Sequence, residues 1–164
     1  MLLSLPDLLG AVPAGQRLLG LDPGSRMIGV AVSDVTLMLA SPHTAIKRAK
    51  LAINAAEIAN IAKKLGAGGL VVGLPLSMDG SFGPAAQAAR DWARALGEFT
   101  AIPCALWDER LSSAAVNRFL IQEADMTRHR RAEVVDRTAA AYMLQAALDA
   151  GRQARQEAAP LEPR

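Results

Sequence analysis

The sequence is poor in the residues that build disulfide frameworks, zinc sites and base-stacking surfaces. Its single cysteine, Cys104, cannot form an intrachain disulfide, and its apolar neighbours favour a small buried side chain over a nucleophile. The two histidines, His43 and His129, lack the spaced partners of a zinc site. Aromatic residues make up only 4% of the chain, so a platform that stacks unpaired bases is not expected.

Long apolar runs and an export signal are also missing. The first sixteen residues are apolar, but Pro6 and Asp7 interrupt them and no lysine or arginine precedes Arg17. This stretch is too short and broken to cross a bilayer, and it lacks the basic start of a secretory signal. Together with the single cysteine, this predicts a cytoplasmic protein without membrane contact, in which residues 1–16 form an N-terminal extension packed on the domain.

The composition is that of one compact domain. Hydrophobic residues make up 51% and charged residues 21% of the 164 residues, which is enough apolar surface for one core. We predict a domain over residues 17–150 and a disordered tail over residues 151–164, where no apolar period is found. The formal charge of +2 allows an anionic partner but does not require one, so the positions of the arginines matter more than the total.

Apolar patterns and glycine or proline breaks predict the order of strands and helices. The predicted strands are residues 17–22, 27–33, 43–48, 70–74 and 103–107, and the predicted helices are residues 51–65, 85–96, 112–123 and 132–150. Glycines at positions 66, 97 and 151 should end three of these helices, and the arginine-rich stretch 124–131 should form a mobile loop. A three-strand meander followed by helix-linked strands predicts an α/β domain with a mixed five-stranded sheet and helices on both faces.

Three carboxylates occupy positions where the pattern otherwise predicts burial. Asp22 ends the first strand, and Glu109 follows the last strand on the face shared by Ala105 and Trp107. Asp136 heads an apolar helical stripe and should face the domain. Buried charge is costly unless it is compensated, and open α/β sheets place ligands at the carboxyl ends of their strands. Asp22, Glu109 and Asp136 are therefore the candidate catalytic and metal-binding residues.

Each carboxylate also has an ordinary structural explanation. Asp22 could cap the turn that follows it, and Glu109 could form a surface ion pair with Arg110. Asp136 could favour the dipole in the first turn of its helix, although this would not explain an inward direction. These alternatives remain open from the sequence alone.

Three carboxylates supply the hard oxygen donors that Mg²⁺ or Mn²⁺ prefers, with water and a substrate phosphate completing the coordination. Two ions about 3.5–4 Å apart would activate a water and stabilise the leaving oxygen of an in-line displacement at phosphorus. The residues thus predict metal-dependent hydrolysis of phosphodiester bonds.

Four ordered motifs carry a resemblance to a known family. They are Leu21-Asp22-Pro23-Gly24-Ser25-Arg26 with Ile28-Gly29-Val30-Ala31-Val32-Ser33-Asp34, Val72-Gly73-Leu74-Pro75-Leu76-Ser77-Met78-Asp79-Gly80-Ser81, Asp108-Glu109-Arg110-Leu111, and Val135-Asp136-Arg137-Thr138-Ala139-Ala140. From about Arg17 to Asp149 the chain closely resembles the YqgF family, which comprises RuvC-like bacterial proteins named as pre-16S rRNA nucleases or Holliday junction resolvases. Any one motif alone would be weak, but the four in order are specific.

The resemblance implies an RNase H-like fold, a divalent-metal phosphodiesterase site and action on structured nucleic acid during 5′-end maturation of pre-16S rRNA. By position it assigns Asp22, Glu109 and Asp136 as the metal-binding acids. Two departures leave this site intact. Ser112-Ser113 stand where the family usually has two threonines, and residues 128–131 are Arg-His-Arg-Arg where lysines are frequent.

Arginines around the predicted site would bind phosphate groups of the substrate. The candidate substrate-binding residues are Arg26, Arg110, Arg128, Arg130 and Arg131. The expected partner is RNA (pre-16S rRNA) or branched DNA, recognised through backbone and shape. A solvated arginine loop without a partner is the alternative, and the sequence does not decide between RNA and DNA, endonuclease and exonuclease, or monomer and homodimer.

Three rival functions follow from the same residues. One is a Holliday junction resolvase in DNA recombination or repair, which would need two sites and hence a dimer. Another is a non-catalytic module that binds nucleic acid or a transcription factor and keeps the acids as vestiges. An actin-like ATPase shares the core topology, but it needs a second domain for which 164 residues leave no room.

Overall fold

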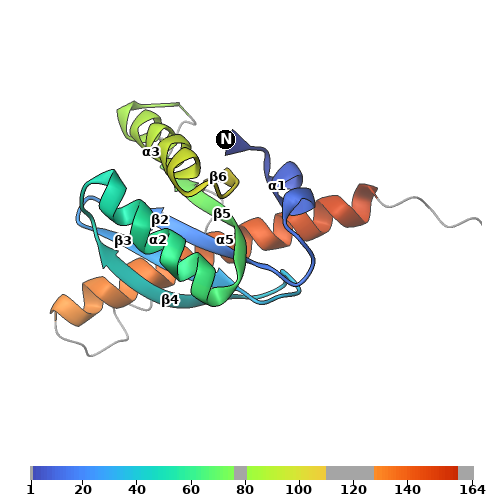
Figure 1. The fold of residues 1–164 in the computed structure, drawn as a ribbon, viewed down its shortest axis with the longest axis horizontal. Coiled ribbons are helices and arrows are strands. Elements are labelled where there is room, and N and C mark those ends of the chain that lie inside the picture. Colours follow the sequence, from blue (N-terminus) through green and yellow to red (C-terminus); the bar gives the residue numbers. More distant parts are fainter. Residues whose placement is uncertain (1, 76–80, 110–127, 159–164) are drawn as a thin grey trace, which may run out of the picture.

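The computed structural model describes residues 2–75, 81–109 and 128–158, and of residues 128–135 and 158 it describes the backbone alone. The fold has three layers (Figure 1): helices α2 (Leu51–Leu65) and α3 (Pro84–Thr100) cover one face of a β-sheet, and the long helix α5 (Arg128–Ala158) crosses the other. Separate apolar clusters fill the two interfaces. The expected α/β architecture with helices on both faces is confirmed.

The sheet has six strands in the order β1-β6-β5-β2-β3-β4. The strands are β1 (Leu2–Leu3), β2 (Arg17–Pro23), β3 (Met27–Ser33), β4 (Ala40–Lys47), β5 (Ala67–Leu74) and β6 (Cys104–Asp108). Strands β2, β3 and β4 form the expected antiparallel meander, and β5 and β6 continue the sheet parallel to β2. The five predicted strands are confirmed, and β1, which pairs parallel with β6, is a sixth that was not predicted.

The N-terminal extension packs on the domain as predicted. Helix α1 (Leu5–Ala11) begins at Ser4, whose hydroxyl accepts from the Asp7 backbone N–H at 3.2 Å. Its buried Leu8 and Leu9 join the apolar cluster under α5. Across the described ranges, no helix combines the length and the apolar character that a membrane span requires.

Alternation along β2 sets which side chains face which layer. Leu19 and Leu21 belong to the cluster under α2 and α3, whereas Leu18 belongs to the cluster under α5. Because side chains alternate along a strand, Gly20 and Asp22 share the α5 face with Leu18. Helix α5 lies close there, since a Cβ added to Gly20 would lie 2.7 Å from Leu144 Cβ.

Two predicted helix ends are wrong, because the glycines at those positions lie inside helices. Helix α2 ends at Gly66, in the left-handed region with φ 68°, as predicted. By contrast, α3 continues through the buried Gly97 to Thr100, and α5 continues through Gly151 to Ala158. A Cβ at Gly151 would overlap the Leu9 side chain of α1, so this glycine allows the two helices to pack closely.

The course of α5 corrects two further expectations. Residues 128–131 lie in this helix rather than in a mobile loop, and residues 152–158 lie in it rather than in a disordered tail. The predicted helix over residues 112–123 and the remainder of the predicted loop lie outside the described residues, as do residues 159–164. The domain boundaries at 17 and 150 stay a prediction.

Candidate active site

Asp22 and Glu109 meet at one edge of the sheet. Asp22 lies near the end of β2, and Glu109 follows β6 directly. Strand β5 lies between them and runs parallel to both, so the three carboxyl ends share an edge. A Cβ added to Gly73 of β5 would lie 2.5 Å from Glu109 Oε1. The Glu109 side chain therefore lies over Gly73 and reaches toward β2, where it is hydrogen-bonded to Asp22.

This arrangement changes the acidity of Glu109. Burial is the largest cause, followed by the hydrogen bond with Asp22 and the negative charges of Asp22 and Asp108, and together they raise the pKa of Glu109 to about 8. At neutral pH the protonated form of Glu109 is accordingly favoured, and its O–H donates a hydrogen bond to the Asp22 carboxylate. A proton thus lies between the carboxyl groups of Glu109 and Asp22, where a bound cation would otherwise offset their negative charge.

Asp136 reaches the same edge from α5. Its backbone carbonyl oxygen lies directly over Gly29 of β3, at a distance that leaves no room for a Cβ. Gly29 is the register partner of Asp22, and cross-strand partners point to the same face of a sheet. Burial, and then the charge of Asp22, raise the pKa of Asp136. Asp22 therefore interacts with both Glu109 and Asp136.

The structure argues against the ordinary structural explanations for Asp22 and Asp136. Helix α5 begins at Arg128 and has no acidic residue in its first turn, so the helix dipole does not account for Asp136, about two turns further on. The turn after Asp22 is closed by its own backbone, with the Gly24 N–H donating to the Met27 carbonyl at 2.9 Å. The proposed ion pair of Glu109 with Arg110 lies outside the described residues.

The three acids suit a divalent cation by their chemistry, although their side chains do not form a finished ligand set. All three are hard oxygen donors, and burial together with the charge of Asp22 disfavours the ionised forms of Glu109 and Asp136. Within the described part of the chain, however, no group of three or more His, Cys, Asp or Glu side chains stands close enough to hold a metal ion. Binding would require the Glu109 carboxyl to exchange its proton for the cation and to turn toward it.

Two glycines complete the site, and the sequence analysis did not single them out. Gly29 and Gly73 sit inside otherwise apolar strands, and they allow Asp136 and Glu109 to approach the sheet. An isolated glycine inside a strand often marks such a close approach. That signal was present in the sequence, but it does not say which residue approaches.

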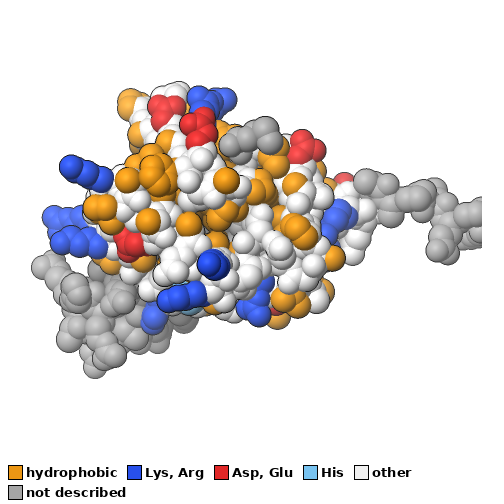
Figure 2. All heavy atoms as spheres, viewed as in Figure 1, with side chains coloured by type: hydrophobic (Ala, Val, Ile, Leu, Met, Phe, Trp, Pro, Cys, Tyr) orange, Lys and Arg blue, Asp and Glu red, His pale blue; other side chains and the backbone are white. Residues whose placement is uncertain are grey.

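The candidate substrate-binding arginines are only partly described. Arg26 is exposed in the turn between β2 and β3, four residues after Asp22. Arg128, Arg130 and Arg131 lie in the first turn of α5 with undescribed side chains, and Arg110 lies outside the described residues. Figure 2 shows several Lys and Arg side chains together at the left end of the view, where α2 begins in Figure 1.

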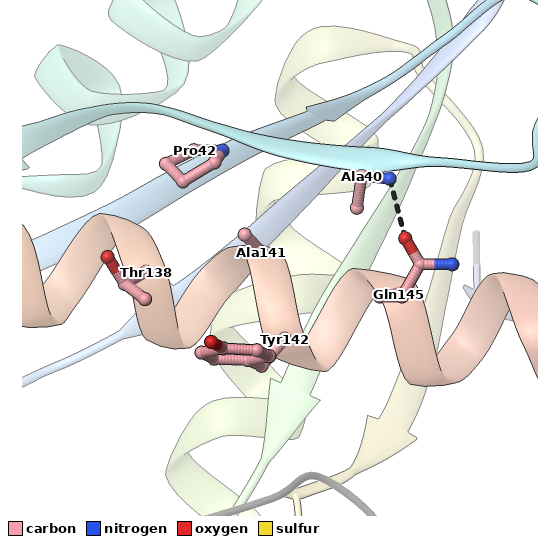
Figure 3. A pocket seen from close by; sticks show the side chains of 6 residues that line it. All are labelled: Ala40, Pro42, Thr138, Ala141, Tyr142 and Gln145. Carbon is pink, nitrogen blue, oxygen red and sulfur yellow. Dashed lines mark hydrogen bonds between the residues drawn. The ribbon is translucent and has the colours of Figure 1, made fainter. Parts of the chain in front are cut away.

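A cavity of about 250 Å³ lies elsewhere, between β4 and α5 (Figure 3). Its lining consists of Ala40, Pro42, Thr138, Ala141, Tyr142 and Gln145. The Gln145 Oε1 accepts from the Ala40 backbone N–H at 2.8 Å and so ties the helix to the edge strand. Among the described residues no carboxylate lines this cavity, so it is separate from the acid cluster.

Without metal, the protein should lose stability as the pH rises toward 8. The pKa of Glu109 is about 8 in the folded state against an ordinary 4.5, so the folded state keeps a proton that the unfolded chain has lost. This stabilisation is complete below about pH 4.5 and is lost as the pH rises through 8. Thermal unfolding of EDTA-treated protein between pH 5 and 9 should show a falling Tm. Glu109→Gln should remove most of the fall, and an equal slope in both proteins would contradict the assignment.

Comparison with known proteins gives a family match and close relatives. The family model described as "RuvX: Holliday junction resolvase" matches residues 16–150. A "Putative pre-16S rRNA nuclease" of Gluconacetobacter diazotrophicus is 65% identical over 149 residues, which cover 91% of this chain and 97% of that protein. A protein of the same name from Gluconobacter oxydans is 66% identical over 146 residues, covering 89% and 91% of the two chains.

Among solved structures, the fold is similar to that of RuvC. The structure titled "T. thermophilus RuvC in complex with Holliday junction substrate" matches with a TM-score of 0.50 and 15% identity, over 82% of this chain and 94% of that one. A second, "Thermus thermophilus RuvC structure", gives a TM-score of 0.52 at 12% identity, over 84% and 97%. At such low identity the likeness concerns the fold alone, and it confirms the expected RNase H-like fold.

Proposed function

Since this chain belongs to the RuvX family, we propose that it is a divalent-metal-dependent nuclease that hydrolyses phosphodiester bonds of structured nucleic acid. The observation that carries the proposal is the interaction of Asp22 with both Glu109 and Asp136 at the carboxyl edge of the sheet. Acids far apart in the chain thereby interact, and the charges of Glu109 and Asp136 are disfavoured there, which is typical of a functional site.

In this proposal Asp22, Glu109 and Asp136 hold Mg²⁺ or Mn²⁺. When bound, the ion would lower the pKa of a water molecule and offset the charge of the phosphate. Glu109 would hold the ion as an ionised carboxylate, without the proton that it carries in the metal-free protein. Arg26, exposed in the turn that follows Asp22, would bind a neighbouring phosphate, and Arg110, Arg128, Arg130 and Arg131 would extend that contact.

The substrate we propose is pre-16S rRNA, processed at its 5′ end during ribosome biogenesis in the cytoplasm. The close relatives bear the name of such a nuclease. Cleavage of a four-way DNA junction is the second candidate, because the matching family is described as a Holliday junction resolvase. The two differ in assembly, since trimming one RNA strand requires one site, whereas symmetric resolution requires a homodimer with two sites.

End-labelled pre-16S rRNA and a four-way DNA junction, offered side by side with Mn²⁺, test the proposal. We expect cleavage of the RNA near its mature 5′ end and little cleavage of the junction. Preferential junction cleavage at paired sites, by protein that sediments as a dimer, would favour the resolvase. Asp22→Asn purified in parallel controls for contaminating nuclease.

Metal binding should release protons from the acid cluster. Because the pKa of Glu109 is about 8, Mn²⁺ must displace its proton at neutral pH, so affinity should rise by up to about tenfold per pH unit between pH 6 and 8. Calorimetry in two buffers of different ionisation enthalpy should show release of nearly one proton at pH 7. Glu109→Gln should lose this release and bind Mn²⁺ weakly.

The same Mn²⁺ titration distinguishes a metal-dependent nuclease from a module that only binds nucleic acid. Absence of Mn²⁺ binding that depends on Asp22 and Glu109, together with intact RNA binding, would favour a non-catalytic module with vestigial acids. Unchanged Mn²⁺ affinity in Glu109→Gln would place the ion elsewhere on the protein.

A further inference from the structure

Arg48 connects the turn after Asp22 to the opposite layer of the fold. It follows β4 directly and is half-buried. Its Nη1 donates to the Gly24 carbonyl at 2.7 Å, and its guanidinium carbon lies 5.7 Å from the centre of the Trp92 ring on α3. Its own backbone N–H donates to the Arg26 carbonyl at 2.8 Å. One residue thus holds the turn between β2 and β3 by both its side chain and its backbone.

The backbone that presents Arg48 is itself fixed by a buried amide. Asn54 of α2 is fully buried. Its Oδ1 accepts from the Ala49 N–H at 2.8 Å, and its Nδ2 donates to the Lys47 carbonyl at 3.0 Å. These bonds hold the residues on either side of Arg48. A buried polar group with its bonds satisfied strongly favours one arrangement, because breaking the bonds would leave it unpaired in the interior.

The turn that Arg48 holds is tight and leads straight to the acid cluster. The Gly24 N–H donates to the Met27 carbonyl at 2.9 Å, and a Cβ at Gly24 would lie 2.7 Å from that same oxygen. Asp22 is two residues before Gly24, so a shift of the turn would move the Asp22 carboxylate. A metal ligand must be held within about 0.5 Å of its productive position to bind well.

We propose that Arg48 is a positioning residue, which fixes the Asp22 carboxylate for the cation by tying the Gly24 carbonyl to Trp92. This proposal deepens the proposed function and rests on it. Arg48 lies beside the candidate site but is not a phosphate clamp, because its guanidinium is already held between a carbonyl and an aromatic ring. Its charge strengthens the hydrogen bond to the carbonyl, as ionised donors do.

Three variants separate positioning from general stability. Arg48→Met keeps an apolar stem over Trp92 but cannot donate to Gly24, whereas Arg48→Lys keeps a cationic donor. Arg94→Met removes an exposed cation from the same helix that carries Trp92 and serves as the matched control. We expect Arg48→Met to lower kcat and weaken Mn²⁺ binding by about tenfold each, with the substrate KM changed less than about twofold. Arg48→Lys should recover most of both losses, and Arg94→Met should show neither.

Amide hydrogen exchange on metal-free protein tests the hydrogen bond between Arg48 and Gly24 without an activity assay. Arg48→Met should speed exchange at the Gly24 N–H by about tenfold or more, while Arg94→Met should not. Fast exchange without a change in kcat or Mn²⁺ binding would overturn the positioning role, and so would unchanged exchange at Gly24. A rise in KM alone would overturn it too, by making Arg48 a substrate contact. Wild-type protein that cleaves nothing would instead reject the proposed function, while the exchange result would still stand.

Discussion

Asp136→Asn is expected to lower Mn²⁺-dependent cleavage by about 1,000-fold, which corresponds to about 4 kcal/mol of lost transition-state stabilisation. Asparagine keeps the size of the side chain but removes the charge that would bind the cation. The variant should fold normally, because burial and the charge of Asp22 already raise the pKa of Asp136 and disfavour its ionised form. Steady-state cleavage of end-labelled RNA, with Tm as the check on folding, measures both effects.

The matched control lies on the same helix. Asp149 is exposed near the far end of α5 and is paired with Arg152, so Asp149→Asn removes one carboxylate from α5 without touching the acid cluster. It should retain wild-type cleavage. If Asp136→Asn cleaves as well as this control, in preparations free of contaminating nuclease, then Asp136 is not part of the active site.

Gly29→Ala is expected to destabilise the fold by about 3 kcal/mol or more, a fall in Tm of roughly 6–12 °C for a chain of this size. The added Cβ would overlap the backbone carbonyl oxygen of Asp136. A backbone oxygen cannot rotate away as a side chain can, so α5 would have to move off the sheet. Because α5 carries Asp136 and Gly29 pairs with Asp22, the same shift would separate the acids and lower activity at temperatures where the protein stays folded.

A second glycine provides the comparison. Gly10 of α1 has nothing within 4 Å of an added Cβ, so Gly10→Ala should be neutral or stabilising by up to about 1 kcal/mol through helix propensity. Chemical denaturation of the two variants gives the difference directly. Equal stability of Gly29→Ala and wild type would mean that α5 does not pack as closely on β3 as the structure shows.

Patterns that repeat along the chain could be predicted from sequence, and contacts between distant segments could not. The short apolar runs of β2 and β3 with the break between them, and the apolar spacing of α2 with its stop at Gly66, predicted those elements nearly to the residue. Gly97 and Gly151 carry the same local signal as Gly66 but lie inside helices, where Gly97 is buried and Leu9 packs against Gly151. Strand β1 has two residues and depends on pairing with β6, so no period could show it.

The candidate site likewise has residues that the sequence predicts and contacts that only the fold defines. Asp22 and Glu109 could be found because acids at the ends of apolar strands are rare, and Asp136 because it interrupts an apolar stripe. The sequence does not show that Gly29 lies opposite Asp22 or that Arg48 contacts Gly24. Both contacts join different segments of the chain, and the pattern within one segment does not name its partner. The raised pKa of Glu109 also depends on burial, which only the folded chain defines.

Anomalous diffraction from crystals soaked in Mn²⁺ tests the central claim most directly. We expect a manganese peak bonded to carboxylate oxygens of Asp22, Glu109 and Asp136, with the Glu109 carboxyl turned from Asp22 toward the ion. The peak should disappear in Asp136→Asn crystals grown and soaked in the same way. A manganese ion bound elsewhere, or no peak at this edge of the sheet at millimolar Mn²⁺, would contradict it.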